Sequence, residues 1–401
     1  MTTVLAIDLD AVRENFLNWS RKAHPGKCAA VVKADAYGLG AEVIAPAIAE
    51  AGCEHFFTAL PEEAMRLRPV LPDRNIYVFS GVQNRNIEEF QRYSLIPVLN
   101  DLDQVRCWTS LARKLQRPLP CLIHIDTGMN RLGFDSGTLH ALVRNCDELR
   151  WLDVRYVITH FACADDPDDE FSSAQRELFD ELRRVLPAAP TSIGNSAGTM
   201  LGPKYAGDLA RIGIALYGAN PGSQPDNPSR LVVRMLSEVL QIRELDCEQP
   251  IGYGSTKRLP AGSRIATIGT GYADGLPRSL SNRGFAFIAG QRVPIVGRVS
   301  MDLTMLDVSS IPLKELKAAK EAELIGANIT LEEVAGLAGT INYEILTGLG
   351  RRARRRYLTR GASSGQIEGA GGRSPNQSTQ PYCGHPNACP SREGQSGVER
   401  S

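Results

Sequence analysis

Short apolar runs and longer amphipathic stretches alternate along the chain from residue 28 to residue 215. Apolar runs bounded by polar turns predict buried β-strands, and the amphipathic stretches between them predict helices. The predicted strands lie at 28–33, 56–59, 75–79, 95–99, 121–125, 154–159, 191–193 and 210–215. The clearest predicted helices lie at 40–51, 61–67, 102–115 and 172–185.

This alternation predicts an α/β fold with a parallel sheet. Eight strand–helix units in about 200 residues fit an N-terminal (β/α)8 barrel of the TIM type. A doubly wound open sheet is the alternative, because periodicity alone does not count strands. Ahead of these units, residues 4–9 predict a further strand, and Asp10 is the predicted N-cap of the helix that follows it.

After Gly218 the pattern changes to that of a mainly β domain. Residues 221–228 are rich in Gly, Pro, Asn and Ser, which is typical of a linker. Strands are predicted at 231–245, 263–272, 285–309 and 322–330, with a hairpin turn near Gly290 and one helix at 331–337. Residues 359–401 have few large apolar side chains and predict a disordered tail. We therefore expect a barrel over 1–225 and a mainly β domain over 226–358, with the first strand free to pack against the β domain.

Charge and cysteine content exclude several classes of protein. Lys and Arg number 45 and Asp and Glu also number 45, so net charge gives no reason to expect nucleic acid or an anionic membrane as partner. No apolar run is long enough to span a bilayer, and the N-terminus lacks the pattern of a signal peptide. The nine cysteines are an odd number and mostly scattered, which favours reduced thiols and a cytoplasmic location. We expect no metal site, because Cys383, His385 and Cys389 are too few ligands for zinc.

Chemistry in such a barrel belongs to the loops after the strands. Lys33 follows the first predicted barrel strand, where loss of solvent can lower the pKa of its amine and make it a nucleophile or a base. Ser196 follows the seventh strand and Gly213 lies in or after the eighth, where barrels often bind phosphate. A lysine opposite a phosphate site suggests pyridoxal phosphate. Arg211 is then the candidate partner of the ring nitrogen, which an arginine would leave unprotonated.

Nine motifs in order resemble those of bacterial alanine racemases, which are fold-type III pyridoxal-phosphate enzymes. The resemblance covers residues 4–358. The motifs are VKADAYG at 32–38, DTGMNRLG at 126–133, THFA at 159–162, NSAG at 195–198, RIGIALYG at 211–218, GYG at 252–254, GYADG at 271–275, GRVSMD at 297–302 and YEIL at 343–346.

The resemblance implies roles for individual residues. Lys33 matches the lysine that binds the cofactor as a Schiff base and is one catalytic base, and Tyr253 matches the base on the opposite face. The positions that match cofactor contacts are Tyr37, His160, Asn195, Ser196, Arg211, Gly213, Ile214 and Tyr343. Arg131 and Met301 match groups near the substrate carboxylate. The positions that match the access corridor are Asp165, Tyr272, Arg278 and Arg298.

The activity that the resemblance implies is interconversion of L-alanine and D-alanine by two bases, which supplies D-alanine for peptidoglycan. It also implies a homodimer with shared active sites, because Tyr253 and Met301 reach the site of the other subunit in the family. A racemase acting on serine or on a broader set of amino acids is the alternative. A non-catalytic pyridoxal-phosphate carrier would lack the second domain, and a related decarboxylase would need an acidic partner for the ring nitrogen.

Two features depart from the family or stand outside its motifs. His124 occupies a position where many relatives have a modified lysine that holds the arginine matching Arg131, so we expect no such modification here. Five arginines between residues 351 and 356 are predicted to form a solvated basic segment.

Overall fold

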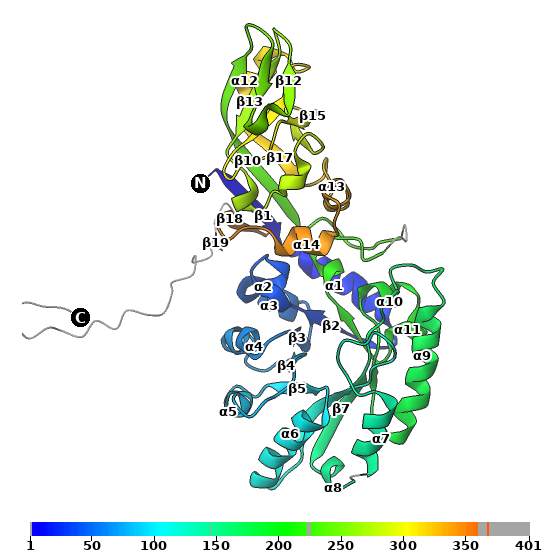
Figure 1. Ribbon diagram of the computed structural model, residues 1–401. Coiled ribbons are helices and arrows are strands. Elements are labelled where there is room, and N and C mark those ends of the chain that lie inside the picture. Colours follow the sequence, from blue (N-terminus) through cyan, green and yellow to red (C-terminus); the bar gives the residue numbers. More distant parts are fainter. Residues whose placement is uncertain (1, 145, 223–225, 360–366, 369–401) are drawn as a thin grey trace, which may run out of the picture. The chain divides into compact units, whose positions relative to one another are not determined.

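The computed structural model describes residues 2–144, 146–222, 226–359 and 367–368 (Figure 1). Its N-terminal part is an eight-stranded parallel sheet in the order β8-β7-β6-β5-β4-β3-β2-β9. The strands are β2 (Lys27–Val31), β3 (His55–Thr58), β4 (Asn75–Val78), β5 (Ile96–Leu99), β6 (Leu119–His124), β7 (Leu152–Ile158), β8 (Thr191–Ser192) and β9 (Leu209–Ile212). All eight predicted barrel strands are thus confirmed to within a few residues.

The two outer strands of this sheet, β8 and β9, approach each other and nearly close it into a barrel. Ser192 Oγ donates to Leu209 O at 2.6 Å, and Arg211 N donates to Gly194 O at 2.8 Å. Every residue of β3, β5 and β9 is buried, as expected for strands covered on both faces. The barrel prediction is therefore confirmed, and the open-sheet alternative is wrong.

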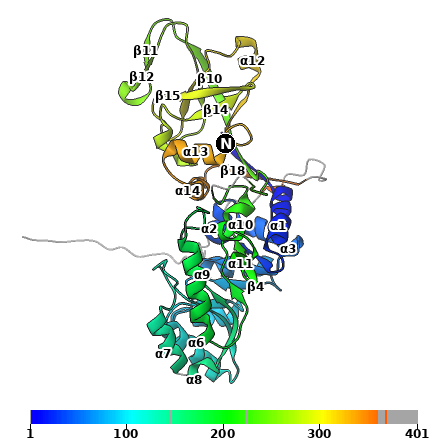
Figure 2. The same cartoon turned by 90° about the vertical axis from the view of Figure 1, so that its right-hand side faces the viewer.

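Helices cover the outside of the parallel sheet in both Figure 1 and Figure 2. They are α3 (Ala41–Glu50), α4 (Pro61–Leu67), α5 (Ile87–Arg92), α6 (Leu102–Lys114), α7 (Ser136–Arg144), α8 (Cys146–Leu149) and α9 (Phe171–Leu182). In α6, Val105, Trp108 and Leu111 recur at helical spacing and are buried, while Asp101 caps the first turn. Shorter helical turns are η1 (Arg68–Val70), η2 (Arg183–Val185), α10 (Ser196–Met200), α11 (Pro203–Ala206) and η3 (Ile214–Tyr217).

The helix α1 (Leu9–Ala23) begins two residues earlier than predicted. Asp8, not Asp10, is the N-cap, because its extended backbone lets its carboxylate accept from Ala11 N at 2.9 Å. Asp10 lies in the first turn and pairs with Arg13 at 3.0 Å. Phe16 and Trp19 are buried, as their spacing predicts.

The second part of the chain is built on a sheet in the order β13-β16-β15-β14-β17-β10-β1-β18-β19. A further pairing of β13 with β10 closes six of these strands into a ring. The strands are β1 (Thr3–Asp8), β10 (Val233–Glu244), β13 (Arg264–Ile268), β14 (Phe285–Ile288), β15 (Gln291–Val296), β16 (Thr304–Asp307), β17 (Glu321–Ile325), β18 (Arg354–Leu358) and β19 (Ile367–Glu368). The first strand of the chain therefore lies in this sheet, between β10 and β18.

Smaller elements complete the second domain. A separate hairpin pairs β11 (Gln249–Ile251) with β12 (Lys257–Leu259). The helical elements are η4 (Tyr253–Ser255), η5 (Tyr272–Asp274), η6 (Arg278–Leu280), α12 (Leu313–Ala318), α13 (Leu331–Ala338) and α14 (Asn342–Thr347). The hairpin turn predicted near Gly290 is confirmed, with positive φ at both Ala289 and Gly290. The predicted strand region at 285–309 contains this hairpin and a third strand, β16.

The arginine-rich segment is not the solvated end that its composition predicts. Arg355 donates through Nε and Nη2 to Gly38 O at 3.0 and 2.7 Å, and Arg352 pairs with Asp274 at 2.8 Å. Arg354 and the two residues after it belong to β18. Distant carbonyl and carboxylate groups therefore hold this segment in the fold.

Several sequence predictions concern residues outside the described ranges. Of the predicted tail at 359–401, the structure describes 359 and the two residues of β19, and Cys383, His385 and Cys389 lie outside it. In the predicted linker, 223–225 lie outside it. Within the described ranges, no three His, Cys, Asp or Glu side chains converge to hold a metal ion. No helix there combines the length and apolar character needed to cross a membrane.

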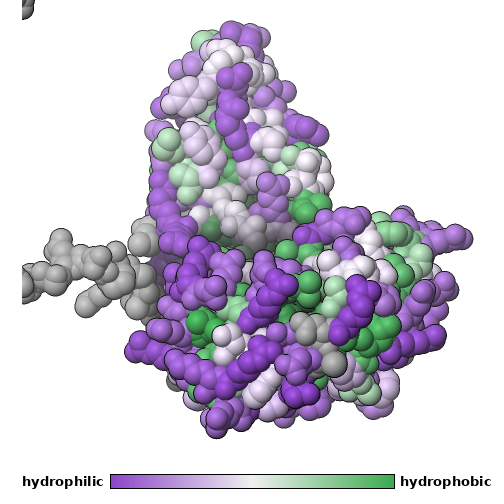
Figure 3. All heavy atoms as spheres, turned by 60° about the horizontal axis from the view of Figure 1, so that its bottom comes forward, coloured by the Kyte–Doolittle hydropathy of each residue, from purple (hydrophilic) through white to green (hydrophobic). Residues whose placement is uncertain are grey.

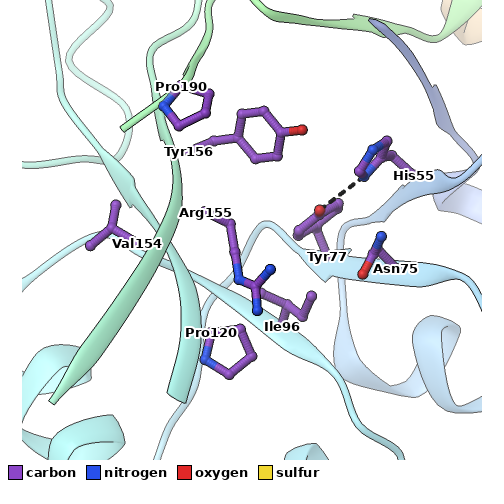
Figure 4. Close-up of a pocket in the computed structure, with 9 residues that line it drawn as sticks. All are labelled: His55, Asn75, Tyr77, Ile96, Pro120, Val154, Arg155, Tyr156 and Pro190. Atoms are coloured by element: carbon purple, nitrogen blue, oxygen red, sulfur yellow. Dashed lines mark hydrogen bonds between the residues drawn. The ribbon is translucent and has the colours of Figure 1, made fainter. Parts of the chain in front are cut away.

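A cavity of about 420 Å³ lies at the amino-terminal end of the barrel strands (Figure 4). His55 Nδ1 and the Tyr77 hydroxyl are 3.0 Å apart at its wall, and Tyr156 and Arg155 project from β7 beside them. Burial lowers the pKa of His55 to about 4, so this histidine is neutral at physiological pH.

Figure 3 shows a mostly hydrophilic surface with small hydrophobic patches on the lower face of the molecule.

Candidate active site

The polar residues predicted to carry chemistry follow the carboxyl ends of the barrel strands, opposite the cavity just described. Lys33 comes two residues after β2 and begins α2 (Lys33–Tyr37). Ala34, Asp35, Ala36 and Tyr37 all have φ between 52° and 56°. A left-handed conformation costs a non-glycine residue roughly 1–2 kcal/mol. Four such residues in a row are therefore held by their surroundings, as is typical of functional sites.

Two carboxylates hold this left-handed turn, one from outside it and one from within it. Glu63 Oε1 accepts from Ala34 N at 2.7 Å, and its Oε2 accepts from Ala59 N at 2.8 Å. Asp35 Oδ1 accepts from Ala41 N at 2.8 Å, which links the turn to the start of α3. The turn therefore fixes the backbone on the carboxyl side of Lys33.

Lys33 is partly buried, with its Nζ 5.9 Å from the centroid of the Phe79 ring. Burial lowers the pKa of the Lys33 amine, and the positive charge of Arg131 lowers it further, against the opposing effect of Glu63. A lowered pKa increases the fraction of neutral amine near pH 7. The amine is thus prepared to act as a nucleophile or a base.

Arg211, on β9, is buried at the centre of the site. Its Nη1 donates to Ser192 O at 2.5 Å and to Ser192 Oγ at 2.7 Å, and its Nη2 donates to Thr159 O at 2.6 Å. The buried Nε is without a hydrogen-bond partner among the described residues. Burial lowers the pKa of Arg211 to about 9, so the side chain still carries its proton at neutral pH. Arg211 therefore presents one unused donor inside the protein.

His160 lies beside Arg211, with its Nδ1 3.3 Å from Arg211 Nη2. Burial and then the charge of Arg211 hold the pKa of His160 well below its usual value. The Asn195 amide nitrogen lies 3.5 Å from His160 Nε2, and the Asn195 side chain also caps α10. Donors therefore face both ring nitrogens, and a neutral ring accepts at only one of them.

The loops after β8 and β9 meet at a group of hydroxyls and backbone amides. Ser196 Oγ accepts from Gly213 N at 3.0 Å, and Ile214 follows directly at the start of η3. Gly213 is packed so closely against the Tyr37 hydroxyl that a Cβ on it would overlap that oxygen. The rings of Tyr37 and Tyr343 are 6.1 Å apart. Burial raises the pKa of Tyr343 to about 12, so its hydroxyl is neutral at pH 7.

His124, the last residue of β6, has a defined protonation. Asn100 Nδ2 donates to Phe79 O and Val98 O at 3.0 and 2.9 Å, so Asn100 Oδ1 is the acceptor that faces His124 Nδ1 at 2.8 Å. Burial and the charge of Arg211 lower the pKa of His124 to about 3. His124 is therefore neutral with its proton on Nδ1, which leaves the lone pair on Nε2.

The remaining predicted residues are not hydrogen-bonded to this group in the part of the chain that the structure describes. Arg131 is exposed on the loop after β6, and Asp165 is exposed on the loop after β7. Tyr253 is 71% exposed, Met301 53% and Tyr272 43%, all on loops of the second domain. Arg278 begins η6, and the Arg298 guanidinium lies beside Gly254, next to Tyr253.

Sequence reasoning missed two residues that hold groups of this site, Glu63 and Asn100, and it gave no individual role to Arg352. Glu63 is one of several glutamates in its region, and Asn100 follows a strand without any motif around it. The only signal in the sequence was the position of Glu63 in the first turn of the predicted helix at 61–67, where a glutamate can accept from nearby backbone N–H groups. Arg352 was assigned to the basic segment.

Comparisons with known proteins agree with this arrangement. The model of the family "Alanine racemase, N-terminal domain" matches residues 7–221, and "Alanine racemase, C-terminal domain" matches 232–357. An alanine racemase of Rhodospirillum rubrum is 43% identical over 367 residues, which cover 91% of this chain and 98% of that protein. A catabolic alanine racemase of Agrobacterium fabrum is 44% identical over 360 residues, 90% of this chain and 93% of that protein. The crystal structure of alanine racemase from Bartonella henselae with covalently bound pyridoxal phosphate is 38% identical, with a TM-score of 0.85 over 89% of this chain and 100% of that one.

Proposed function

The chain belongs to the alanine racemase family, and we propose that it interconverts L-alanine and D-alanine with pyridoxal phosphate as its cofactor. The observation that carries this proposal is the buried and unpartnered Nε of Arg211. A buried donor without an acceptor is costly, so such an atom points to a ligand that supplies the acceptor. The unprotonated ring nitrogen of pyridoxal phosphate is an acceptor of this kind.

The residues around Arg211 fit the rest of the same cofactor. The hydroxyls of Tyr37, Ser196 and Tyr343 and the backbone N–H groups of Gly213 and Ile214 would bind its phosphate. His160 and Asn195 would lie against its ring, with His160 kept neutral by burial. Lys33 would hold it covalently through the amine, whose pKa burial lowers.

Pyridoxal phosphate, when bound, supplies an electron sink that makes the α-proton of an attached amino acid acidic. The chain itself must then remove that proton on one face and return one on the other. We assign Lys33 Nζ to one face and the Tyr253 hydroxyl to the opposite face. Two unlike bases on opposite faces invert the centre without rotation of the substrate.

Substrate binding falls to residues at the mouth of the barrel and on the second domain. Arg131 supplies a cation for the substrate carboxylate, and Met301 supplies an apolar contact near it. The access corridor would be formed by Asp165, Tyr272, Arg278 and Arg298. The exposed positions of Arg131 and Tyr272 in the single chain are compatible with these roles.

We further propose a homodimer in which each active site takes Tyr253 and Met301 from the partner subunit. Large apolar side chains that are exposed in the single chain are available for burial against a partner. Tyr253 at 71% exposure and Met301 at 53% are such side chains in this chain. In the cell, the product D-alanine would serve peptidoglycan synthesis.

The test of this function is direct. The purified chain, loaded with pyridoxal phosphate, is given L-alanine, and D-alanine is followed over time, with Lys33→Ala as the control. We expect conversion to a one-to-one mixture by the unaltered chain and none by the variant. L-serine at the same concentration tests the alternative substrate. Absence of D-alanine with a fully loaded protein would contradict the proposal.

A further inference from the structure

One arginine after α14 joins two loops of the second domain. Arg352 donates through Nε and Nη2 to the two carboxylate oxygens of Asp274, at 2.9 and 2.8 Å. Its third nitrogen, Nη1, donates to Asp302 Oδ1 at 2.6 Å. The planar guanidinium thus holds two carboxylates at once, which a lysine could not do with the same geometry.

The Asp274 carboxylate is part of the backbone structure of its own loop. Asp274 is 3% exposed, and its Oδ2 also accepts from Gly271 N at 2.9 Å at the start of η5. Gly350 N donates to Asp274 O at 2.9 Å, so the arginine-bearing turn and this loop are also joined through the backbone. A carboxylate this deeply buried depends on its paired cation. Removal of Arg352 would therefore loosen η5 itself.

The second loop, which contains Met301, is bonded to the first one. Tyr272 N donates to Ser300 O and Ala273 N donates to Met301 O, both at 3.0 Å. Gly271 packs so closely on Ser300 O that a Cβ would overlap it. Asp302, the residue after Met301, is the one that Arg352 Nη1 holds. Arg352 therefore anchors both the loop of Tyr272 and the loop of Met301.

We propose that Arg352 is a positioning residue that fixes Met301 for substrate binding in the partner subunit's active site and fixes Tyr272 in the access corridor. This inference rests on the proposed function, because it takes the role of those two side chains from it. Arg352 acts through the loops that it holds. Its loss should weaken substrate binding and leave the two proton-transfer groups in place.

The separation of binding from chemistry follows from how the other loops are held. The Tyr253 turn packs against the beginning of the Met301 loop, where Arg298 lies beside Gly254. This beginning is held by other residues, because Gly297 N donates to Asn282 Oδ1 at 2.6 Å and Val299 N donates to Ser281 Oγ at 3.0 Å. The Lys33 turn is held by Glu63 and Asp35. Neither of these supports includes Arg352. A change at Arg352 should therefore raise KM far more than it lowers kcat.

The experiment compares Arg352→Gln with Arg351→Gln in the loaded full-length enzyme. Arg351 is the exposed neighbour in sequence. We expect Arg352→Gln to raise KM for L-alanine about tenfold while kcat changes less than about threefold, and Arg351→Gln to change neither. Equal kinetic constants in both variants, or a fall in kcat at constant KM, would overturn the proposal.

Two further measurements keep the result unambiguous. Asp302→Asn weakens only the hydrogen bond from Arg352 Nη1 and leaves Asp274 paired with Arg352. This variant should raise KM for L-alanine by about threefold, even if Arg352→Gln does not fold. Hydrogen exchange of peptides covering 271–275 and 300–303 should be faster in Arg352→Gln and unchanged in Arg351→Gln. This second readout needs no activity, so it separates failure of the loop anchor from failure of the proposed racemase function. Equal exchange in the two variants would overturn the anchor.

Discussion

Arg211 Nη2 lies 3.3 Å from His160 Nδ1, with Arg211 buried in the barrel and His160 partly buried beside it. The contact requires a neutral imidazole, because a protonated His160 would place a second cation against the guanidinium. With Nη1 and Nη2 occupied by Ser192, Thr159 and His160, only Nε remains for a ligand. This geometry makes the position specific for arginine.

Arg211→Lys should therefore impair both cofactor binding and turnover. A lysine ammonium cannot reach Ser192, His160 and the ring nitrogen together. We expect kcat to fall at least about tenfold and the dissociation constant of pyridoxal phosphate to rise, measured by D-alanine formation and by the visible absorption of the bound cofactor. The exposed Arg85 supplies the matched control, and Arg85→Lys should behave as the unaltered enzyme. Normal cofactor affinity in Arg211→Lys would contradict the assignment.

Glu63→Gln should destabilise the left-handed turn after Lys33. Both carboxylate oxygens accept backbone N–H groups, from Ala34 at 2.7 Å and from Ala59 at 2.8 Å. An amide replaces one acceptor by a donor, which leaves one of these N–H groups unpaired. We expect a loss of about 1–3 kcal/mol in the free energy of unfolding, measured with urea. Glu62→Gln, on the exposed neighbour, is the control, and an equal loss in both variants would count against the role of Glu63.

The free energy of unfolding should depend on pH through His55, the buried histidine at the amino-terminal end of the barrel strands. The folded-state pKa of His55 is about 4, below the usual value of 6.5. As pH falls, the unfolded chain therefore binds a proton at His55 before the folded chain does. The contribution of His55 to the free energy of unfolding is complete above about pH 6.5 and is lost as pH falls toward 4. This site should contribute a slope of about 1.4 kcal/mol per pH unit between pH 6 and 4.5.

His55→Gln removes that titration and tests the slope. The free energy of unfolding is measured across this pH range for the unaltered chain and for the variant. Whatever its overall stability, the variant should show a curve that is shallower by the contribution of one histidine. Parallel curves for the two proteins would show that His55 does not titrate on unfolding as the structure implies.

The sequence was most informative where burial is uniform. In β3 and β5 every residue is buried, so apolar runs mark these strands without ambiguity. Capping was harder to predict, because Asp8 and Asp10 are equally good caps by type. Only the extended backbone of Asp8, with φ of −87° and ψ of 103°, decides between them. Local composition does not determine that backbone.

Supports of the site that act across long sequence separations were not predictable. In the sequence, Arg352 is one of several neighbouring arginines. Nothing near it marks its role, because its partners Asp274 and Asp302 are 78 and 50 residues away. The left-handed turn at 34–37 contains no Gly or Asn to suggest positive φ, and the glutamate that holds it comes from the next helix. In contrast, Lys33, Ser196 and Arg211 were predictable because barrel strands deliver their following residues to one end.

The central claim is that Lys33 of one subunit works with Tyr253 of the other. Lys33→Ala and Tyr253→Phe are each expected to be inactive as homodimers. Co-expressed in equal amounts, they form heterodimers in which one site of two has both residues intact. We predict that the mixture recovers about a quarter of the unaltered activity, because half of the dimers contain one intact site each. If both residues of a site came from the same chain, no intact site would form, and a mixture without activity would contradict the claim.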